Sequence, residues 1–469
     1  MDETEGLIEV ITAEVERIAR EHHCPSIAWG LLSDGVLVSH GGTGALDDGF
    51  VPDLNTVYRI ASMTKSFTAA AVLILRDEGL LALDDPITDH APELAPVRGT
   101  TSDSGPIRIR HLLTMSSGVV TDNPWGDRHL DITDDGLDAV VNEGLVFSGT
   151  TGSSFDYSNL GFGLLGRVVK RATGRPVQEL ITERLLEPLG LTSTTWRKPD
   201  HDAWARPYRV RDGTFVPDGM DPLGDGQIAP MGGLWSTVAD VARWIAWLDD
   251  AFPARDGADE GPMSRASRRE MQDHHRHTGA TTLHGRTVGN GYGYGLRVRS
   301  DPRMGRLVAH SGGLPGYGSN MRWSTGRRIG MVALANVTYA PMADLTQAVF
   351  ESMLERGVFP AAEPIPAPLV HEFAPRLVAL LNDWDDASAD ALFADNVAPD
   401  ETYDRRRSEA ERWRAECGGV LHIEQVIPTS AAAGRILLRR AGSEPFELQF
   451  KLSPAGPPRI QKYAEIDDD

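Results

Sequence analysis

The chain has 469 residues, of which 41% are hydrophobic, and its formal net charge is −21 at pH 7. At roughly 150 residues per domain, this length predicts two or three folded units. The acidic charge argues against a nucleic-acid partner or an anionic membrane surface, because proteins bind both through basic patches. We therefore expect a folded globular protein that binds neither.

The N-terminal segment is acidic, and its apolar residues have helical spacing: Leu7, Ile8, Ile11, Val15 and Ile18. It lacks the basic and apolar regions of a signal peptide, and no apolar run in the chain approaches the ~20 residues that span a bilayer. The two cysteines, Cys24 and Cys417, show no metal-binding or redox spacing, which predicts free thiols in a reducing compartment. Together these features predict a cytoplasmic location without a membrane partner.

The elements predicted in chain order describe an antiparallel sheet with helices inserted into it. Two apolar stretches in residues 26–46 flank Asp34-Gly35, which predicts a β-hairpin. Helical patterns occur from about residue 80 to 290, strand-like patterns occupy 291–337, and a helix follows. Strands at both ends with helices between them predict an α/β fold of the α+β type, in which the terminal strands share one antiparallel sheet.

A proline-rich stretch, residues 360–370, predicts a linker between two domains. The pattern changes beyond it, with helical periodicity first and four strand candidates afterwards. We therefore expect a large N-terminal domain over residues 1–359 and a small α+β domain over residues 371–469.

Lysine is rare in this chain, which makes the position of Lys65 informative. Only five of the 46 Lys+Arg residues are lysines, and Lys65 follows Ser62 by three residues near the start of a predicted helix. That spacing puts both side chains on one helix face. A desolvated lysine can lose its proton, which arginine does not, and a neutral amine can activate a serine nucleophile. The alternative is an N-cap serine with an exposed lysine, because Ser-x-x-Lys alone is a weak pattern.

A second candidate element is Tyr157-Ser158-Asn159, the only Tyr-x-Asn in the chain. It lies between a Gly/Ser/Thr-rich loop and a predicted helix, so its side chains would be presented at a helix start. A tyrosine there can shuttle a proton between the serine and a leaving group. The alternative is a capping Ser158 or Asn159 beside a packed tyrosine.

The third element is His310-Ser311-Gly312-Gly313, which follows a strand predicted over 307–310. Glycines directly after a strand allow a close approach of backbone to ligand. A backbone N–H of Gly312 or Gly313 would complete an oxyanion hole with that of Ser62, while His310 projects into the site. The alternative is a hairpin turn with a half-buried histidine.

In this order, Ser62-x-x-Lys65, Tyr157-x-Asn159 and His310-x-Gly312 resemble the three active-site motifs of the penicillin-recognising serine hydrolases. The most similar subgroup comprises class C β-lactamases, DD-peptidases of the same type, and related esterases and D-amino-acid peptidases. The resemblance covers residues 10 to 355. It implies a β-lactamase/transpeptidase-like fold, an antiparallel sheet flanked by helices with an inserted helical region.

The resemblance also implies roles in an acyl-enzyme mechanism. Ser62 would be the nucleophile, and Lys65 would act as general base or keep Tyr157 ionised. Tyr157 would protonate the leaving group and later activate water, and Asn159 would hold the substrate amide or the lysine. His310 stands where many members carry lysine and is typical of peptidase- and esterase-like members, so it attracts a substrate carboxylate less strongly.

Three functions agree with these motifs. The first is a hydrolase of esters or of peptides with D-residues, acting on a small-molecule or peptide acyl substrate. The second resembles penicillin-binding-type thioesterases that cyclise peptides, where an amine replaces water and an extra C-terminal domain is present. The third is a non-catalytic binder or sensor, which has no need for a deprotonatable lysine at position 65.

No Walker or dinucleotide motif occurs, so we expect no organic cofactor. We expect no metal site either, because the cluster at His274, His275 and His277 has no regular ligand spacing. Trp235, which follows two glycines closely, is a candidate for lining the substrate pocket. Whether the protein forms a homo-oligomer is left open by the sequence.

Overall fold

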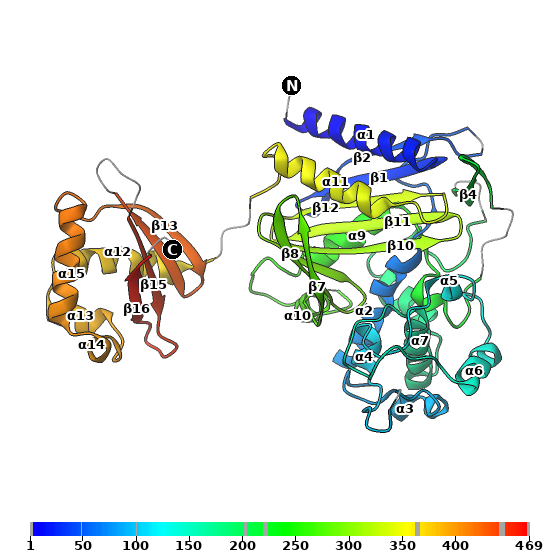
Figure 1. Ribbon diagram of the computed structural model, residues 1–469, viewed down its shortest axis with the longest axis horizontal. Helices are drawn as coiled ribbons and strands as arrows, with labels where there is room; N and C mark the ends of the chain where they lie inside the picture. Colours follow the sequence, from blue (N-terminus) through cyan, green and yellow to red (C-terminus); the bar gives the residue numbers. More distant parts are fainter. Residues whose placement is uncertain are drawn as a thin grey trace. The chain divides into compact units, whose positions relative to one another are not determined.

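The computed structural model divides the chain into two compact units, residues 1–362 and 363–469 (Figure 1). It describes residues 3–47, 49–99, 101–200, 204–218, 224–259, 261–361, 366–439 and 446–466. Of the predicted linker, residues 362–365 lie outside the described residues, and the last three positions, 368–370, already belong to helix α12. Among the helices of these ranges, none combines the length and apolarity needed to cross a membrane.

The first unit is built on an eight-stranded antiparallel sheet. In spatial order its strands are β2 (Val36–Gly44), β1 (Ser26–Ser33), β12 (Ile329–Ala335), β11 (Tyr317–Thr325), β10 (Gly305–Leu314), β9 (Arg297–Asp301), β8 (Arg286–Tyr292) and β7 (Arg276–Leu283). β1 and β2 form the predicted hairpin, and β1 pairs with β12 from Ile27↔Ala335 to Ser33↔Ile329. The prediction that both ends of the unit share one antiparallel sheet is therefore confirmed.

Helices cover both faces of this sheet. α1 (Glu3–Glu21) and α11 (Met342–Glu355) lie side by side on one face (Figure 1), where Ile11, Val15 and Ile18 are buried. On the other face, α9 (Val238–Asp249) packs against β1, β11 and β12. Two hydrophobic cores, one on each side of the sheet, follow from this layering.

The helical region between β2 and β7 forms the rest of the unit. Its elements are β3 (Tyr58–Arg59), η1 (Ala61–Met63), α2 (Thr64–Asp77), α3 (Ile87–His90), η2 (Pro92–Leu94), α4 (Ile109–Leu113), α5 (Asn123–Gly126), α6 (Asp134–Glu143), α7 (Asn159–Thr173), α8 (Val177–Ile181), η3 (Thr182–Leu186), β4 (Tyr208–Arg211), β5 (Thr214–Pro217), η4 (Ala229–Met231), β6 (Trp235–Ser236) and α10 (Arg265–Met271). α2 packs against α7, α8 and η4 at the centre of this region. The first two predicted motifs thus lie at the starts of two neighbouring helices, with Lys65 in α2 and Asn159 in α7.

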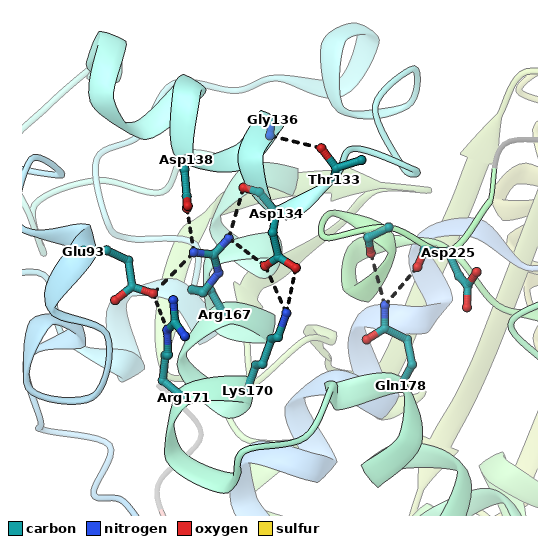
Figure 2. A network of polar contacts seen from close by, with 11 residues as sticks. Glu93, Thr133, Asp134, Gly136, Asp138, Arg167, Lys170, Arg171, Gln178 and Asp225 are labelled. Atoms are coloured by element: carbon teal, nitrogen blue, oxygen red, sulfur yellow. Dashed lines mark hydrogen bonds and ion pairs between the residues drawn. The ribbon is translucent and has the colours of Figure 1, made fainter.

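A polar network fixes α7 to the elements around it (Figure 2). The guanidinium of Arg167, only 1% exposed, pairs with Asp138 at 2.6 Å, Asp134 at 3.2 Å and Glu93 at 3.3 Å. Arg171 also pairs with Glu93, at 2.5 Å. These contacts tie α7 to α6 and η2, and so hold the helix that begins at Asn159.

The second unit has the predicted order of helices followed by strands. Its helices are α12 (Pro368–Asn382), α13 (Asp386–Leu392), α14 (Val397–Asp400) and α15 (Tyr403–Glu416). Its sheet has the order β13 (Ile423–Ser430), β14 (Ala433–Leu438), β15 (Phe446–Leu452) and β16 (Ile460–Glu465). α12 packs on this sheet around a separate hydrophobic core, which confirms a small α+β fold at the C-terminal end.

Candidate active site

Ser62 lies in the short 3-10 turn η1, directly before α2. The preceding residue, Ala61, has a φ of 48°, a left-handed conformation that costs a residue with a Cβ about 1–2 kcal/mol. The Ser319 hydroxyl of β11 donates to the Ile60 carbonyl at 2.8 Å. The serine is thus presented on a strained turn that the main sheet holds in place.

Lys65 lies in the first turn of α2 and is fully buried. Its Nζ is 3.0 Å from Ser62 Oγ, 2.7 Å from Asn159 Oδ1 and 2.8 Å from the Met231 carbonyl oxygen. The predicted alternative of an exposed lysine on a helix surface is therefore wrong. The amine contacts the serine, the second motif and the backbone of η4 at once.

Burial strongly affects the ionisable groups around this amine. Burial lowers the pKa of Lys65 below its ordinary value, and Arg297 lowers it further, whereas the carboxylates of Asp127 and Asp122 oppose that change. Burial also raises the pKa of Asp127, while a hydrogen bond from the Tyr339 hydroxyl lowers it. The lysine therefore releases its proton more readily than a solvated lysine does.

Tyr157 lies two residues before α7 and lines the same pocket as Ser62. Lys65 Nζ is 4.9 Å from the centre of its ring. Burial raises the pKa of the phenol above its ordinary value, although a hydrogen bond with Ser62 partly offsets this. The phenol is therefore a protonated donor near neutral pH, and of the two roles expected for Lys65 this favours the general base over a partner that keeps Tyr157 ionised.

Asn159 is the first residue of α7, and its side chain is held at both ends. Oδ1 accepts from Lys65, while Nδ2 donates to Asn123 Oδ1 at 3.0 Å. The Asp122 carboxylate accepts the backbone N–H of Asn159 at 2.6 Å, and Ser158 Oγ caps the helix through the N–H of Gly161. Capping by Ser158, which was the alternative interpretation of this motif, coexists with the contact to Lys65.

His310 lines the pocket, yet both of its ring nitrogens are already engaged. Nδ1 lies 2.7 Å from the Ser311 carbonyl oxygen, which can only accept, so Nδ1 carries the proton. Nε2 then accepts from the Tyr292 hydroxyl at 3.1 Å. Burial, followed by repulsion from Lys65 and Arg297, lowers the pKa of this imidazole well below its usual range. His310 therefore lines the pocket as a neutral imidazole whose two nitrogens already have hydrogen-bond partners.

The glycines after His310 do not follow a strand, as the sequence suggested, but lie inside β10, which runs on to Leu314. A Cβ on Gly312 would lie 2.2 Å from the Ile60 carbonyl oxygen, and one on Gly313 would lie 2.7 Å from the Tyr339 ring. Ser311 accepts from Asn320 Nδ2 of β11 at 2.9 Å. The close approach is between β10 and the turn that carries Ser62.

Trp235 does not belong to the pocket. The described residues that line the pocket do not include it, and its side chain is 1% exposed. Its ring packs edge-on against Trp204 and Tyr317, with the Arg59 guanidinium 5.1 Å from the ring centre. Its nearness to two glycines in the sequence was therefore a misleading signal, because β6 pairs with β3 in the core.

The pocket has a volume of about 480 Å³ and brings Ser62, Tyr157 and the 310–313 segment together. Its remaining walls include three residues that the sequence analysis missed: Asp127, Arg297 and Tyr339. The Tyr339 hydroxyl donates to Asp127 Oδ2 at 2.8 Å across the pocket. These residues come from three separate segments and share no motif, so spacing alone could not have identified them.

Comparison with known proteins agrees with this arrangement. The model of the beta-lactamase family matches residues 9–352. The chain belongs to the beta-lactamase family. The family resemblance and the fold class inferred from the motifs are thereby confirmed.

The relatives of this beta-lactamase family chain include a penicillin-binding protein and an esterase. Penicillin-binding protein 4* of Bacillus subtilis is 28% identical over 297 residues, which cover 60% of this chain and 61% of that protein. Esterase EstB of Burkholderia gladioli is 31% identical over 343 residues, or 64% of this chain and 83% of that protein. The octameric penicillin-binding protein homologue from Pyrococcus abyssi matches 98% of this chain and 100% of its own, with a TM-score of 0.62 at 21% identity, and supports the fold. The family match and the esterase relative support a serine hydrolase.

Proposed function

We propose that the protein is a serine hydrolase that cleaves an ester or amide through an acyl-enzyme on Ser62, as esterases and D-amino-acid peptidases do. The observation that carries this proposal is the fully buried Lys65 amine 3.0 Å from Ser62 Oγ. A general base must lie within hydrogen-bond reach of the proton that it removes, and its pKa must approach the working pH. Burial supplies the second condition by lowering the pKa of Lys65.

In the proposed acylation step, the Ser62 hydroxyl gives its proton to the neutral Lys65 amine while Oγ bonds to the substrate carbonyl carbon. The tetrahedral intermediate then breaks its bond to the leaving group, which takes a proton from the Tyr157 phenol. Water then attacks the acyl-enzyme carbonyl and gives a proton to the Tyr157 phenolate. The protonated Lys65 returns its proton to Ser62 Oγ as the ester bond breaks, and the acid leaves. Backbone N–H groups of Ser62 and of Gly312 or Gly313 are proposed as donors to the oxyanion, and Asn159 as the residue that positions Lys65.

Arg297 extends the proposal to the substrate. Its guanidinium lies 5.7 Å from the Tyr157 ring centre, and within the described ranges no carboxylate forms an ion pair with it. His310 is neutral and engaged on both nitrogens, so Arg297 is the pocket cation that is suited to a substrate carboxylate. This supports acylated peptides or esters with a free carboxylate among the substrates.

Labelling tests the proposal directly. A fluorescent fluorophosphonate and a fluorescent penicillin should each label the protein, and Ser62→Ala should lose the label. Circular dichroism of the variant checks that its fold is kept. If neither reagent labels the folded wild-type protein, the acyl-enzyme is refuted and a non-catalytic binder is favoured.

A peptide cyclase is the second candidate, since it would use the same acyl-enzyme with an amine in place of water. The compact unit 363–469 favours it, because the stand-alone thioesterases that the chain resembles also carry an added C-terminal domain. We infer that this unit is an accessory domain. p-Nitrophenyl esters report hydrolysis, and a linear peptide thioester analysed by mass spectrometry reports cyclisation. A cyclic product in excess over the free acid would assign the cyclase.

We also propose a homo-oligomer, for which the octameric Pyrococcus abyssi homologue provides support by analogy. Size-exclusion chromatography with light scattering measures the mass. A mass equal to the 51.0 kDa of one chain would contradict this part of the proposal.

A further inference from the structure

A second hollow, of about 410 Å³, adjoins the catalytic pocket. Arg297, Ser311 and Ala343 line both spaces. In the main sheet, Ala309 of β10 pairs with Arg297 of β9 on one side and with Arg322 of β11 on the other. Paired residues of antiparallel strands project from the same face. Because the alanine between them is small, the two arginine side chains border open space on the face that α11 covers.

Three guanidinium groups line this hollow, those of Arg297, Arg299 and Arg322, and we call it the arginine hollow. Across the residues that the structure describes, none of the three forms an ion pair with a carboxylate. The nearby carboxylates of Asp301 and Glu351 are paired with Arg286, at 2.8 and 2.5 Å. The hollow therefore carries a concentration of positive charge without a counter-ion of its own.

Neutral acceptors hold the two deeper guanidinium groups in place. Arg322 donates to Thr346 Oγ1 at 3.1 Å and to the Ala343 carbonyl at 3.4 Å. Arg299 donates to Asn290 Oδ1 at 3.1 Å and to Gln347 Oε1 at 3.0 Å. A guanidinium has five N–H donors, so both side chains are oriented and still keep donors for a ligand.

The electrostatic state of these groups is unfavourable without an anion. Arg322 is only 7% exposed, and burial, followed by repulsion from Arg299, lowers its pKa to about 9. Burial also lowers the pKa of Arg299, with Arg286 and Arg297 adding to the effect and Asp301 and Glu351 opposing it. A buried cation is costly unless it is paired, so an oxyanion bound here would remove both the desolvation and the repulsion.

We propose that the arginine hollow binds an oxyanion, a carboxylate or phosphate group, carried at the far end of the substrate whose reactive carbonyl lies at Ser62. This rests on the proposed function of Ser62 and adds the class of substrate. The planar guanidinium fork matches carboxylate and phosphate oxygens in a bidentate manner. The shared lining by Arg297 and Ser311 provides the path from one space to the other.

Matched ester pairs test the proposal. Mono-p-nitrophenyl esters of succinate, adipate and suberate are compared with p-nitrophenyl butyrate, hexanoate and octanoate, which have the same carbon counts without the terminal charge. At the chain length that reaches the hollow, kcat/KM should favour the charged ester by about 10-fold or more, the range of charge-assisted hydrogen bonds. If the neutral esters are hydrolysed and no charged ester is preferred at any length, the proposal is overturned.

Neighbouring threonines on β7 provide a variant and its control. Thr281 is exposed, lines the hollow and accepts a hydrogen bond from Asn290 Nδ2 at 2.8 Å. Thr282 is also exposed but is not among the lining residues. Thr281→Glu should introduce a competing carboxylate and remove the preference for the charged ester, as should Arg299→Gln. Thr282→Glu, with the same charge change, should keep it. The hollow would be refuted as the cause of the preference by either of two results. One is an equal loss of kcat/KM on charged and neutral esters in Thr281→Glu, and the other is an equal effect of the two threonine variants on the preference.

A binding measurement separates this inference from the proposed function. Isothermal titration calorimetry on Ser62→Ala, which needs no catalysis, should detect adipate or inorganic phosphate binding, and Thr281→Glu in the same background should weaken it about 10-fold. Binding of phosphate alone assigns a phosphate group, and binding of adipate alone assigns a carboxylate. If neither binds at millimolar concentration, the inference fails even where ester hydrolysis succeeds. If binding is seen without hydrolysis, only the catalytic proposal fails.

Discussion

The Nζ atom of Lys65 lies 3.0 Å from Ser62 Oγ, and the lysine side chain has no exposure to solvent. The separation of three residues spans the junction of η1 and α2, so both side chains project from one side of a single turn. Burial then lowers the pKa of the amine. A lysine that acts as a base must lie close to the serine hydroxyl and must be shielded from water, and Lys65 meets both conditions. Single substitutions can test each condition.

Lys65→Arg should reduce the rate of acylation by at least about 10²-fold, the lower end of the contribution of general-base catalysis. Arginine keeps the positive charge but does not release its proton at a working pH, so it cannot accept the serine proton. Labelling kinetics with a fluorophosphonate measure the effect. Lys170→Arg is the control, because Lys170 forms an ion pair with Asp134 away from Ser62. This variant should be labelled at the wild-type rate. Retention of most activity in Lys65→Arg would contradict the assignment of the base.

The pH profile of kcat/KM should carry the signature of the same amine. Protonated Lys65 cannot act as a base, so activity on a neutral ester should fall as pH decreases through its lowered pKa, well below the ordinary 10.5. Asp127 raises that pKa by its charge, so Asp127→Asn should move the acid limb to lower pH by about one unit. Asparagine still accepts the hydrogen bond from Tyr339. The exposed Asp135→Asn serves as control, and a shift of the limb to higher pH in Asp127→Asn would be incompatible with this electrostatic account.

The chemistry at Ser62, Lys65, Tyr157 and Asn159 was accessible from the sequence because each role restricts the residue type. The rarity of lysine sharpened this signal, since a base must be able to lose its proton and could not be replaced by the arginine that the chain uses at most other basic positions. The terminal strands were also predictable, because β1 and β12 are continuous apolar runs buried on both faces.

Other parts carried no comparable signal. β7 is a largely exposed edge strand of polar residues, so its sequence lacks the alternation that marks a half-buried strand, and the strand pattern was recognised only from Gly291 onward. Gly312 and Gly313 suggested a strand end, whereas they allow β10 to pass close to η1. Arg297 and Asp127 come to line one pocket only through tertiary packing, which one sequence does not reveal.

Gly312→Ala should destabilise the first unit by about 1–3 kcal/mol, the usual cost of overpacking. The new Cβ would lie 2.2 Å from the Ile60 carbonyl oxygen and 2.9 Å from Ala61 Cβ, so β10 would have to move away from the turn that carries Ser62. Gly289→Ala on β8 is the control, because its Cβ would meet nothing nearer than Ser300 Cβ at 4.0 Å. Thermal unfolding and the labelling rate measure both effects. Similar behaviour of the two variants would show that the close approach is not needed.

Arg167→Met should lower the free energy of unfolding of the first unit by about 1–3 kcal/mol. The Arg167 side chain is 1% exposed and compensates Glu93, Asp134 and Asp138. The side chains of these three acids are 28%, 49% and 44% exposed, so their carboxylates can be partly solvated when the guanidinium is lost. Arg171→Met is the matched control on the same helix, because Arg171 is 48% exposed, and a surface pair contributes less than about 1 kcal/mol. Urea unfolding measures both changes. Since α7 begins at Asn159, Arg167→Met should also slow Ser62 labelling more than Arg171→Met does. Equal losses of stability in the two variants would show that the buried network does not anchor α7.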